Sequence, residues 1–302
     1  MEIASYQSLD AAVRGCFGDN IKTESDIRTF GGDINSARVL SLSDGKKVFL
    51  KYNSIKNSSF FDAEEEGLKA ISDTHTIGTP KLFCKGTDRS ESISFLMMEL
   101  IERGNSKPDT FSVMGYEYAG MHLADTEGFV SGGRYGFLHD NFIGATKQIN
   151  TPKETWIDFF RECRLIPQLK MAERVLAGSV LKAAVSLTDR LGDYLTEPEK
   201  PSLLHGDMWG GNHLTDKNGR VILIDPAAYV GNAEADIAMT EMFSRMPADF
   251  YRAYYERMPK QYGYEDRKDL YNLYHFLNHL NLFGGTYLRP VTDIIRRYAG
   301  RV

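Results

Sequence analysis

The alternation of apolar and polar residues near the N-terminus predicts a β-rich region. Residues 35–43 alternate weakly, the Asp-Gly pair at 44–45 is typical of a hairpin turn, and the KVFLKY run at 47–52 forms the returning strand. Apolar side chains then recur at helical spacing over 60–71, and the apolar run at 92–100 predicts another strand. This order predicts an N-terminal lobe rich in strands with one main helix.

One acidic residue interrupts the apolar side of this predicted helix. Glu64 falls on the same side as the apolar residues, whereas Glu65 and Glu66 are predicted to point away from it. A buried glutamate needs a cation, and Lys51 at the end of the VFLK run is its natural partner. Taken alone, Glu64 fits equally well at the rim of an acidic helix face.

The rest of the chain has mainly helical periodicity. The turn-rich stretch 102–109 is the best boundary, so we expect an N-lobe at 1–101 and a C-lobe at 102–302. The predicted helices of the C-lobe lie near 110–125, 155–195, 235–243 and 267–283. The sequence therefore predicts an α+β fold of two lobes, the second of them mostly helical.

Three polar side chains lie close to one short hairpin of the C-lobe. The VILI run at 221–224 follows a Lys-Asn-Gly turn and is predicted as a buried strand, so Asp225 lies at a strand end. Asp207 and Asn212 precede the first strand of the same hairpin. Folding of the hairpin should bring the three side chains to one edge.

The spacing of these residues is suited to phosphoryl transfer. A protein-kinase catalytic loop also places a base Asp and a metal-binding Asn five residues apart, with a second metal-binding Asp further on. Asn212 and Asp225 can give Mg²⁺ the oxygen ligands that it prefers, and Asp207 remains free to orient and deprotonate a hydroxyl. The HGD tripeptide alone is compatible with an ordinary polar loop, but the whole constellation favours catalysis.

The N-lobe contains the parts of a nucleotide site in the expected order. Gly31 and Gly32 form a turn between extended segments, and Lys51 ends a strand where a kinase has its phosphate-contacting lysine. The end of the last N-lobe strand is the predicted hinge, whose backbone groups would bind adenine. It consists of Met98, Glu99, Leu100 and Ile101. Each signal is weak alone, and their order strengthens them together.

Over nearly its whole length the chain resembles the fructosamine kinase (ketosamine kinase) family, a branch of the protein-kinase-like fold. The matching strings are GGDIN at 31–35, DGKKVFLKYN at 44–53, FFDAEEEGLKAI at 60–71, YGFLHDNFIGATKQIN at 135–150, WIDFFRECRL at 156–165, HGDMWGGN at 205–212, DPAAYVGNAEADIAMTEMF at 225–243 and YHFLNHLNLFGGTYL at 274–288. The most specific are HGD-x-W-x-G-N, IGATKQIN and DPAAYVGNAEAD, which aminoglycoside and choline kinases do not share.

This resemblance implies an ATP-dependent kinase acting on ketosamines, which are sugars joined to a free amine or to a protein lysine. Phosphorylation of the sugar 3-hydroxyl makes the adduct labile, so the implied role is deglycation. The resemblance assigns the base role to Asp207 and Mg²⁺ ligation to Asn212 and Asp225. It also implies that Lys51 contacts phosphate, with Glu64 as its partner.

Several alternatives stay open. Trp209 offers a flat apolar face on which a sugar or amine adduct could stack, or it anchors the loop in the core. A kinase of the same fold could act on another small alcohol such as an aminoglycoside or choline, and a non-catalytic ATP-binding member would be expected to lack Lys51, Asp207 or Asp225. The preferred ketosamine and the oligomeric state also stay open, with a monomer favoured.

Composition is compatible with a cytoplasmic enzyme. The chain has 302 residues, of which 42% are hydrophobic, without an apolar run long enough to cross a membrane. The N-terminus lacks the pattern of a signal peptide, and a net charge of −5 without a basic tract argues against nucleic acid as a partner. The three scattered cysteines, Cys16, Cys84 and Cys163, predict reduced thiols rather than disulfides or a zinc site.

Four other polar positions have predicted roles. Asp236 begins a predicted helix, and in kinase-like folds an acidic residue there bonds the backbone of the catalytic loop. His275 and His279 are four residues apart, but the segment between them lacks the glutamate of a zinc-binding HExxH motif, so a packed or cleft-lining helix is expected. His122 is expected to be a capping or core residue.

Overall fold

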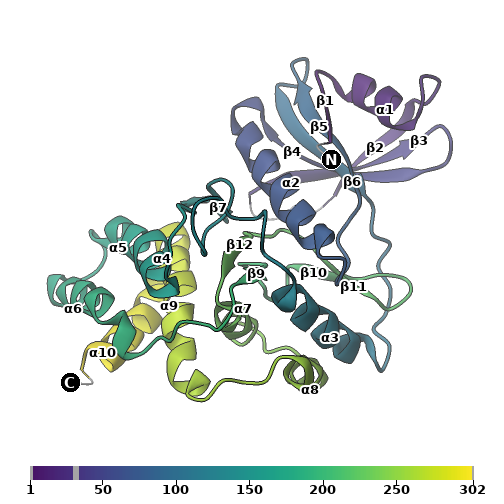
Figure 1. Ribbon diagram of the computed structural model, residues 1–302. Helices are drawn as coiled ribbons and strands as arrows, with labels where there is room; N and C mark the ends of the chain where they lie inside the picture. Colours follow the sequence, from purple (N-terminus) through teal and green to yellow (C-terminus); the bar gives the residue numbers. More distant parts are fainter. Residues whose placement is uncertain (1–2, 30–33, 301–302) are drawn as a thin grey trace.

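The computed structural model describes residues 3–29 and 34–300. A strand-rich N-terminal part and a mostly helical C-terminal part lie side by side (Figure 1). Among the described residues, no helix combines the length and the apolar character needed to cross a membrane.

The N-terminal part is built on a six-stranded sheet with the strand order β1-β5-β6-β4-β3-β2. Neighbouring strands are antiparallel except β1 and β5, which are parallel. The strands are β1 (Ala4–Tyr6), β2 (Thr23–Thr29), β3 (Ser36–Leu42), β4 (Lys47–Ser54), β5 (Leu82–Asp88) and β6 (Ile93–Glu99). The predicted strands at 35–43, 47–52 and 92–100 are therefore confirmed, and Lys51 lies in β4 opposite Leu96 of β6.

Two helices accompany this sheet. Helix α2 (Ser58–Asp73) follows the 3₁₀ turn Ile55–Asn57 and confirms the helix predicted over 60–71. In Figure 1, α2 runs along the side of the sheet that faces the helical part. Helix α1 (Leu9–Phe17) was not predicted; Ser8 caps its start by accepting a hydrogen bond from the backbone N–H of Ala11 at 3.2 Å.

The prediction that Glu65 points away from the buried side of α2 is wrong. Only 5% of Glu65 is exposed, and its carboxylate lies 2.9 Å from Lys85 Nζ. Glu64 is also buried, as predicted, with 8% exposed. Neighbouring positions on a helix can both be buried when its covered face is wide, and α2 contacts both β6 and the later strand β7 (Asn141–Ile143).

The C-terminal part consists mainly of helices. They are α3 (Thr110–Leu123), α4 (Trp156–Phe159), a π-helix (Phe160–Leu165), α5 (Ile166–Ala172), α6 (Gly178–Asp189), α7 (Ala233–Thr240), α8 (Ala248–Arg257), α9 (Tyr264–Phe283) and α10 (Leu288–Ala299), with 3₁₀ turns at Leu191–Asp193 and Gly285–Tyr287. The helical region predicted over 155–195 is divided by a turn near Leu176. The side chain of Leu176 is buried in the core, and α6 contacts α5 after this turn. Helices α8 and α10 were not predicted.

Three small antiparallel pairs complete the fold. They are β7 with β8 (Thr146–Gln148), β9 (Ser202–Leu204) with β12 (Tyr229–Gly231), and β10 (His213–Thr215) with β11 (Val221–Leu223). The β10–β11 hairpin is the predicted one, with Gly219 at a positive φ of 78° in its turn. Strand β6 ends at Glu99 and α3 begins at Thr110. The division into lobes at 1–101 and 102–302 stays a prediction.

Candidate active site

The loop at 205–212, which joins β9 to β10, is held from behind by the carboxylate of Asp236 on α7. Oδ2 of Asp236 accepts a hydrogen bond from the backbone N–H of His205 at 2.7 Å, and Oδ1 accepts one from the N–H of Gly206 at 2.8 Å. Gly206 has a φ of 79° and packs so closely that an added Cβ would lie 2.1 Å from the carbonyl oxygen of Ala227. The predicted bond from Asp236 to this loop is confirmed.

The charge of Asp236 is stabilised although only 2% of the residue is exposed. Burial acts to raise its pKa, but the hydrogen bonds from His122 and Tyr118 and the electrostatic interactions with His122 and His205 outweigh it, so the pKa lies below its usual range. Tyr118 donates its hydroxyl to Oδ2 at 2.6 Å, and His122 Nε2 lies 3.2 Å from the same atom. His122 is a buried core residue, as expected.

Asp207 and Asn212 form one hydrogen-bonded unit inside the loop. The side-chain amide of Asn212 donates to the backbone oxygen of Asp207 at 2.8 Å and to Asp207 Oδ2 at 2.9 Å. Both N–H groups of the amide are thereby occupied, and its oxygen stays available to another ligand. Burial raises the pKa of Asp207 to about 7, although the hydrogen bond from Asn212 acts to lower it.

Lys51 of the sheet pairs with two carboxylates, Glu64 on α2 and Asp225 in the C-terminal part. Its Nζ lies 2.5 Å from Oε1 of Glu64, and it also pairs with Oδ1 of Asp225. Asp225 follows β11 with a left-handed backbone, at a φ of 56°, which turns its side chain away from the strand direction. The predicted pairing of Lys51 with Glu64 is thus present in the structure.

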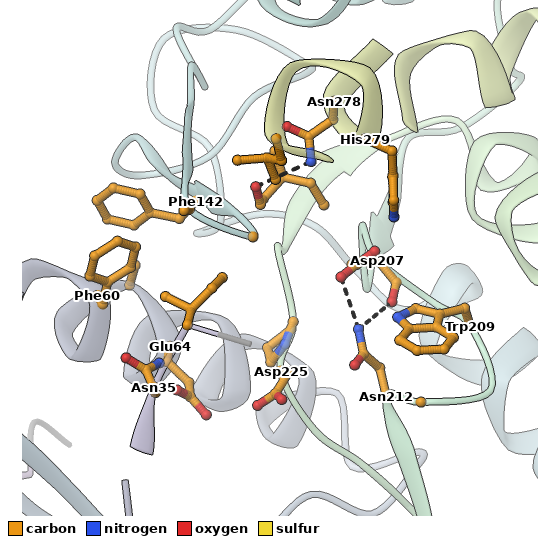
Figure 2. Close-up of a pocket in the computed structure, with 18 of the residues that line it drawn as sticks. Asn35, Phe60, Glu64, Phe142, Asp207, Trp209, Asn212, Asp225, Asn278 and His279 are labelled. Atoms are coloured by element: carbon orange, nitrogen blue, oxygen red, sulfur yellow. Dashed lines mark hydrogen bonds between the residues drawn. The ribbon is translucent and has the colours of Figure 1, made fainter. Parts of the chain in front are cut away.

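These side chains border one cavity of about 870 Å³. The predicted site residues that line it are Lys51, Glu64, Asp207, Trp209, Asn212 and Asp225. In Figure 2, Asp207, Asn212 and Trp209 lie together on one loop, with Asp225 and Glu64 on the side of α2. The structure therefore brings together residues from β4, α2 and the two sides of the β10–β11 hairpin.

The remaining predicted nucleotide-site residues are not part of this lining. Gly31 and Gly32 lie outside the described residues. Met98, Glu99, Leu100 and Ile101 do not border the cavity, and Met98 is 97% covered in a small cluster with Phe61 and Leu96. The hinge role of this segment stays a prediction.

Similarity to known proteins decides the family. The family model described as fructosamine kinase matches residues 5–300. The chain belongs to the fructosamine kinase family. Membership of this kinase family implies ATP as the phosphate donor.

Relatives and solved structures agree with this assignment. The chain is 37% identical to a probable ketoamine kinase of Synechocystis, over 97% of each protein, and 40% identical to the chloroplastic protein-ribulosamine 3-kinase of Oryza sativa, over 89% of this chain and 77% of the relative. A putative fructosamine-3-kinase of Haemophilus somnus superposes with a TM-score of 0.85 at 27% identity, over 96% of both chains. The predicted α+β, two-lobed, protein-kinase-like fold is confirmed.

Two fructosamine kinase motif segments, IGATKQIN and the one after Asp225, meet behind the site. Gln148 donates through Nε2 to the backbone oxygen of Ala227 at 3.0 Å and to Oδ1 of Asn141 at 2.7 Å. Asn141 in turn donates to the backbone oxygen of Ala228 at 2.7 Å. These contacts fix the chain that follows Asp225. Both residues lie in the motif string at 135–150, but the sequence alone predicted no role for Asn141 or Gln148.

Trp209 is at the surface of the cavity rather than in the core. It is 38% exposed, and its ring packs so closely on Gly211 that a Cβ there would lie 2.4 Å from the indole. The absence of a side chain on Gly211 therefore leaves room for the ring. Stacking of Trp209 on a substrate stays a prediction, whereas the alternative of a buried core anchor does not fit this exposure.

His275 and His279 both lie on α9, and their surroundings differ. No cluster of His, Cys, Asp or Glu side chains within residues 3–29 and 34–300 is arranged to hold a metal through three or more of them. His275 is 4% exposed, and His279 lines the cavity. Their helix, α9, is therefore both packed and cleft-lining, in agreement with the expectation.

Proposed function

We propose that this protein is an ATP-dependent kinase that phosphorylates the 3-hydroxyl of ketosamines of the fructosamine or ribulosamine type, free or on protein lysines. The observation that supports the proposal most is one cavity lined by Asp207, Asn212, Asp225 and the Lys51–Glu64 pair. Relatives named ketoamine kinase and protein-ribulosamine 3-kinase, at 37–40% identity, support the ketosamine class.

In the proposed reaction Asp207 acts on the acceptor. Its carboxylate orients the sugar 3-hydroxyl and takes its proton as the hydroxyl oxygen attacks the γ-phosphorus of ATP, while the bond from that phosphorus to the β,γ-bridging oxygen breaks and ADP leaves with the electron pair. The hydrogen bonds from Asn212 hold the Asp207 side chain and main chain in place for this step. Lys51, oriented by Glu64, neutralises phosphate charge of the nucleotide.

Asn212 and Asp225 would hold Mg²⁺. The donor set fits, because the Asn212 amide oxygen, which accepts no hydrogen bond from the described residues, and the Asp225 carboxylate are hard oxygen ligands, and no thiolate borders the cavity among the described residues. When bound, the ion supplies positive charge that offsets the charge of the phosphates.

The metal assignment predicts a selective loss. Asp225→Ala should weaken Mg²⁺-dependent ATP binding about tenfold or more, since a carboxylate ligand is lost. EDTA should abolish turnover of the unaltered enzyme, and Mg²⁺ or Mn²⁺ should restore it.

Calorimetric titration of Asp225→Ala with ATP, with and without Mg²⁺, measures the loss of Mg²⁺-dependent binding. The matched control is Asp249→Ala, which removes an exposed carboxylate on α8 that pairs with Arg252 at 2.8 Å. Normal Mg²⁺–ATP binding by Asp225→Ala, or rescue by zinc alone, would exclude this site.

The substrate assignment is tested by a panel of acceptors. A synthetic ketosamine, its free sugar, choline and an aminoglycoside are each incubated with Mg²⁺–ATP, and products are identified by mass spectrometry and NMR. Phosphate on the 3-hydroxyl of the ketosamine is the expected result. Efficient phosphorylation of choline or the aminoglycoside, without ketosamine product, would exclude the ketosamine assignment and show that the enzyme is a kinase with another acceptor.

Trp209→Ala should raise KM for the ketosamine about tenfold and also lower kcat, because a lost stacking face misplaces the hydroxyl. The KM for ATP should change little. The control is Tyr262→Ala, which removes a fully exposed aromatic ring outside the cavity. Unchanged ketosamine kinetics in Trp209→Ala would remove Trp209 from the substrate site.

A further inference from the structure

One wall of the cavity is made of aromatic side chains, which we call the aromatic wall. It consists of Trp209, Phe243, His279, Phe283 and Tyr287. The ring centroid of His279 lies 4.9 Å from that of Phe243, 5.5 Å from Phe283 and 5.0 Å from Tyr287, and Phe243 lies 6.1 Å from Trp209.

Much of this aromatic surface is uncovered. Trp209, Phe243 and Phe283 are 38%, 41% and 56% exposed, although each contacts another ring of the wall. Clustered exposed aromatic rings beside a cavity are typical of a ligand surface rather than of ordinary packing. The rings come from the catalytic loop, from the segment after α7, from the C-terminal half of α9 and from the 3₁₀ turn that follows it, so no single element explains their grouping.

The charges of the cavity are unevenly placed. Among the lining residues in the described part of the chain, Lys51, Glu64 and Asp225 form one connected ion-pair group. Asp207 is the acidic side chain beside the aromatic wall, and Figure 2 shows it between His279 and Trp209. This end of the cavity therefore has a carboxyl group and ring faces, without a lysine or arginine among its described lining residues.

His279 adds an acceptor to the wall rather than a positive charge. Its Nδ1 lies 2.8 Å from the backbone oxygen of His275, so Nδ1 carries the hydrogen and Nε2 has a free lone pair. Burial lowers the pKa of His279, although the bond to His275 acts to raise it, and the ring stays neutral at pH 7. A cation beside this ring is therefore not repelled.

We propose that the aromatic wall is a subsite for the protonated secondary amine of the ketosamine, an inference that rests on the proposed function. Only two carbon atoms separate the carbon bearing the 3-hydroxyl from the amine nitrogen. Since Asp207 lies between His279 and Trp209, a substrate whose hydroxyl reaches Asp207 can place its ammonium group beside these two rings. Ring faces attract such a cation, and Nε2 of His279 can accept one of its N–H bonds.

This arrangement makes the positive charge itself a determinant of specificity. The substituent on the nitrogen continues past Phe243 and Phe283, which are the more exposed rings, toward solvent. The enzyme should therefore discriminate strongly at the nitrogen atom and weakly beyond it. A neutral atom in place of the nitrogen should lose the attraction while keeping the sugar contacts.

A pair of matched substrates tests the inference. One is a 1-alkylamino-1-deoxyketose, and the other is the 1-O-alkyl ether of the same ketose, which has the same length and the same 3-hydroxyl but no charge. The unaltered enzyme should show a kcat/KM about tenfold or more higher for the amine than for the ether. Equal kcat/KM for the two would overturn the inference and leave the proposed ketose 3-kinase activity standing. An enzyme that phosphorylates neither would remove the proposed function, and the inference with it.

Variants of the wall give a second readout. Phe243→Leu and Tyr287→Leu should each lower kcat/KM for the amine about threefold to tenfold while leaving that for the ether nearly unchanged, because leucine keeps the apolar contact without the π face. The control is Phe60→Leu, a ring of the same cavity that packs on Phe142 at 4.2 Å, away from the wall. It should affect both substrates alike. Equal losses for amine and ether in the wall variants would reduce the wall to a packing role.

Discussion

Replacement of Asp207 by asparagine should lower kcat by about 10²–10⁴, the usual contribution of a general base. The substitution is nearly isosteric, and the new amide oxygen can still accept the hydrogen bond that Asn212 now donates to Asp207 Oδ2 at 2.9 Å. The loop should therefore keep its shape, held by Asp236 through the backbone of His205 and Gly206. Loss of activity would then reflect loss of the proton acceptor.

Single-turnover kinetics with saturating ketosamine and Mg²⁺–ATP measures this effect. ATP affinity and the thermal transition of Asp207→Asn should remain close to those of the unaltered enzyme. Asp249→Asn, on the surface of α8, is the control for a generic loss of one carboxylate. A folded Asp207→Asn enzyme with unaltered turnover would show that another group accepts the proton.

The central part of the site could be predicted because its geometry is local. Asp207, Asn212 and Asp225 lie on either side of one hairpin, and the turn before VILI determines how that hairpin closes. A short apolar strand with a polar residue at its end has few ways to fold. The spacing alone was therefore enough to place these three residues at the same cavity, and Lys51 in β4 followed from the strand pattern.

Other features depend on contacts between distant segments, which periodicity does not reveal. The burial of Glu65 depends on Lys85 of β5, from a strand beyond the helix. The aromatic wall brings Phe243 and Tyr287 to the same histidine from segments far apart in the chain. Helix α10 was not predicted although its apolar residues follow helical spacing; only a short 3₁₀ turn separates it from α9.

The hydrogen bonds that Asp236 accepts behind the catalytic loop should also contribute to the free energy of unfolding. Its two carboxylate oxygens accept the backbone N–H groups of His205 and Gly206, and Oδ2 also accepts from the hydroxyl of Tyr118. Asparagine has one acceptor oxygen, so its NH₂ group would face a backbone N–H and leave that donor unsatisfied. Asp236→Asn should therefore lower the free energy of unfolding by about 1–3 kcal/mol, the cost of leaving a buried donor unsatisfied.

The pH dependence distinguishes lost charge from lost packing. The folded pKa of Asp236 is depressed, so its stabilisation is present above the unfolded pKa of about 3.9 and is lost as the pH falls through the folded pKa. Urea unfolding of the unaltered protein and of Asp236→Asn should thus differ most near neutral pH, and the difference should shrink below about pH 4. Asp249→Asn should change the free energy of unfolding by less than about 0.5 kcal/mol. A difference for Asp236→Asn that stays constant from pH 7 to pH 3 would mean that shape, and not the ionised carboxylate, holds the catalytic loop.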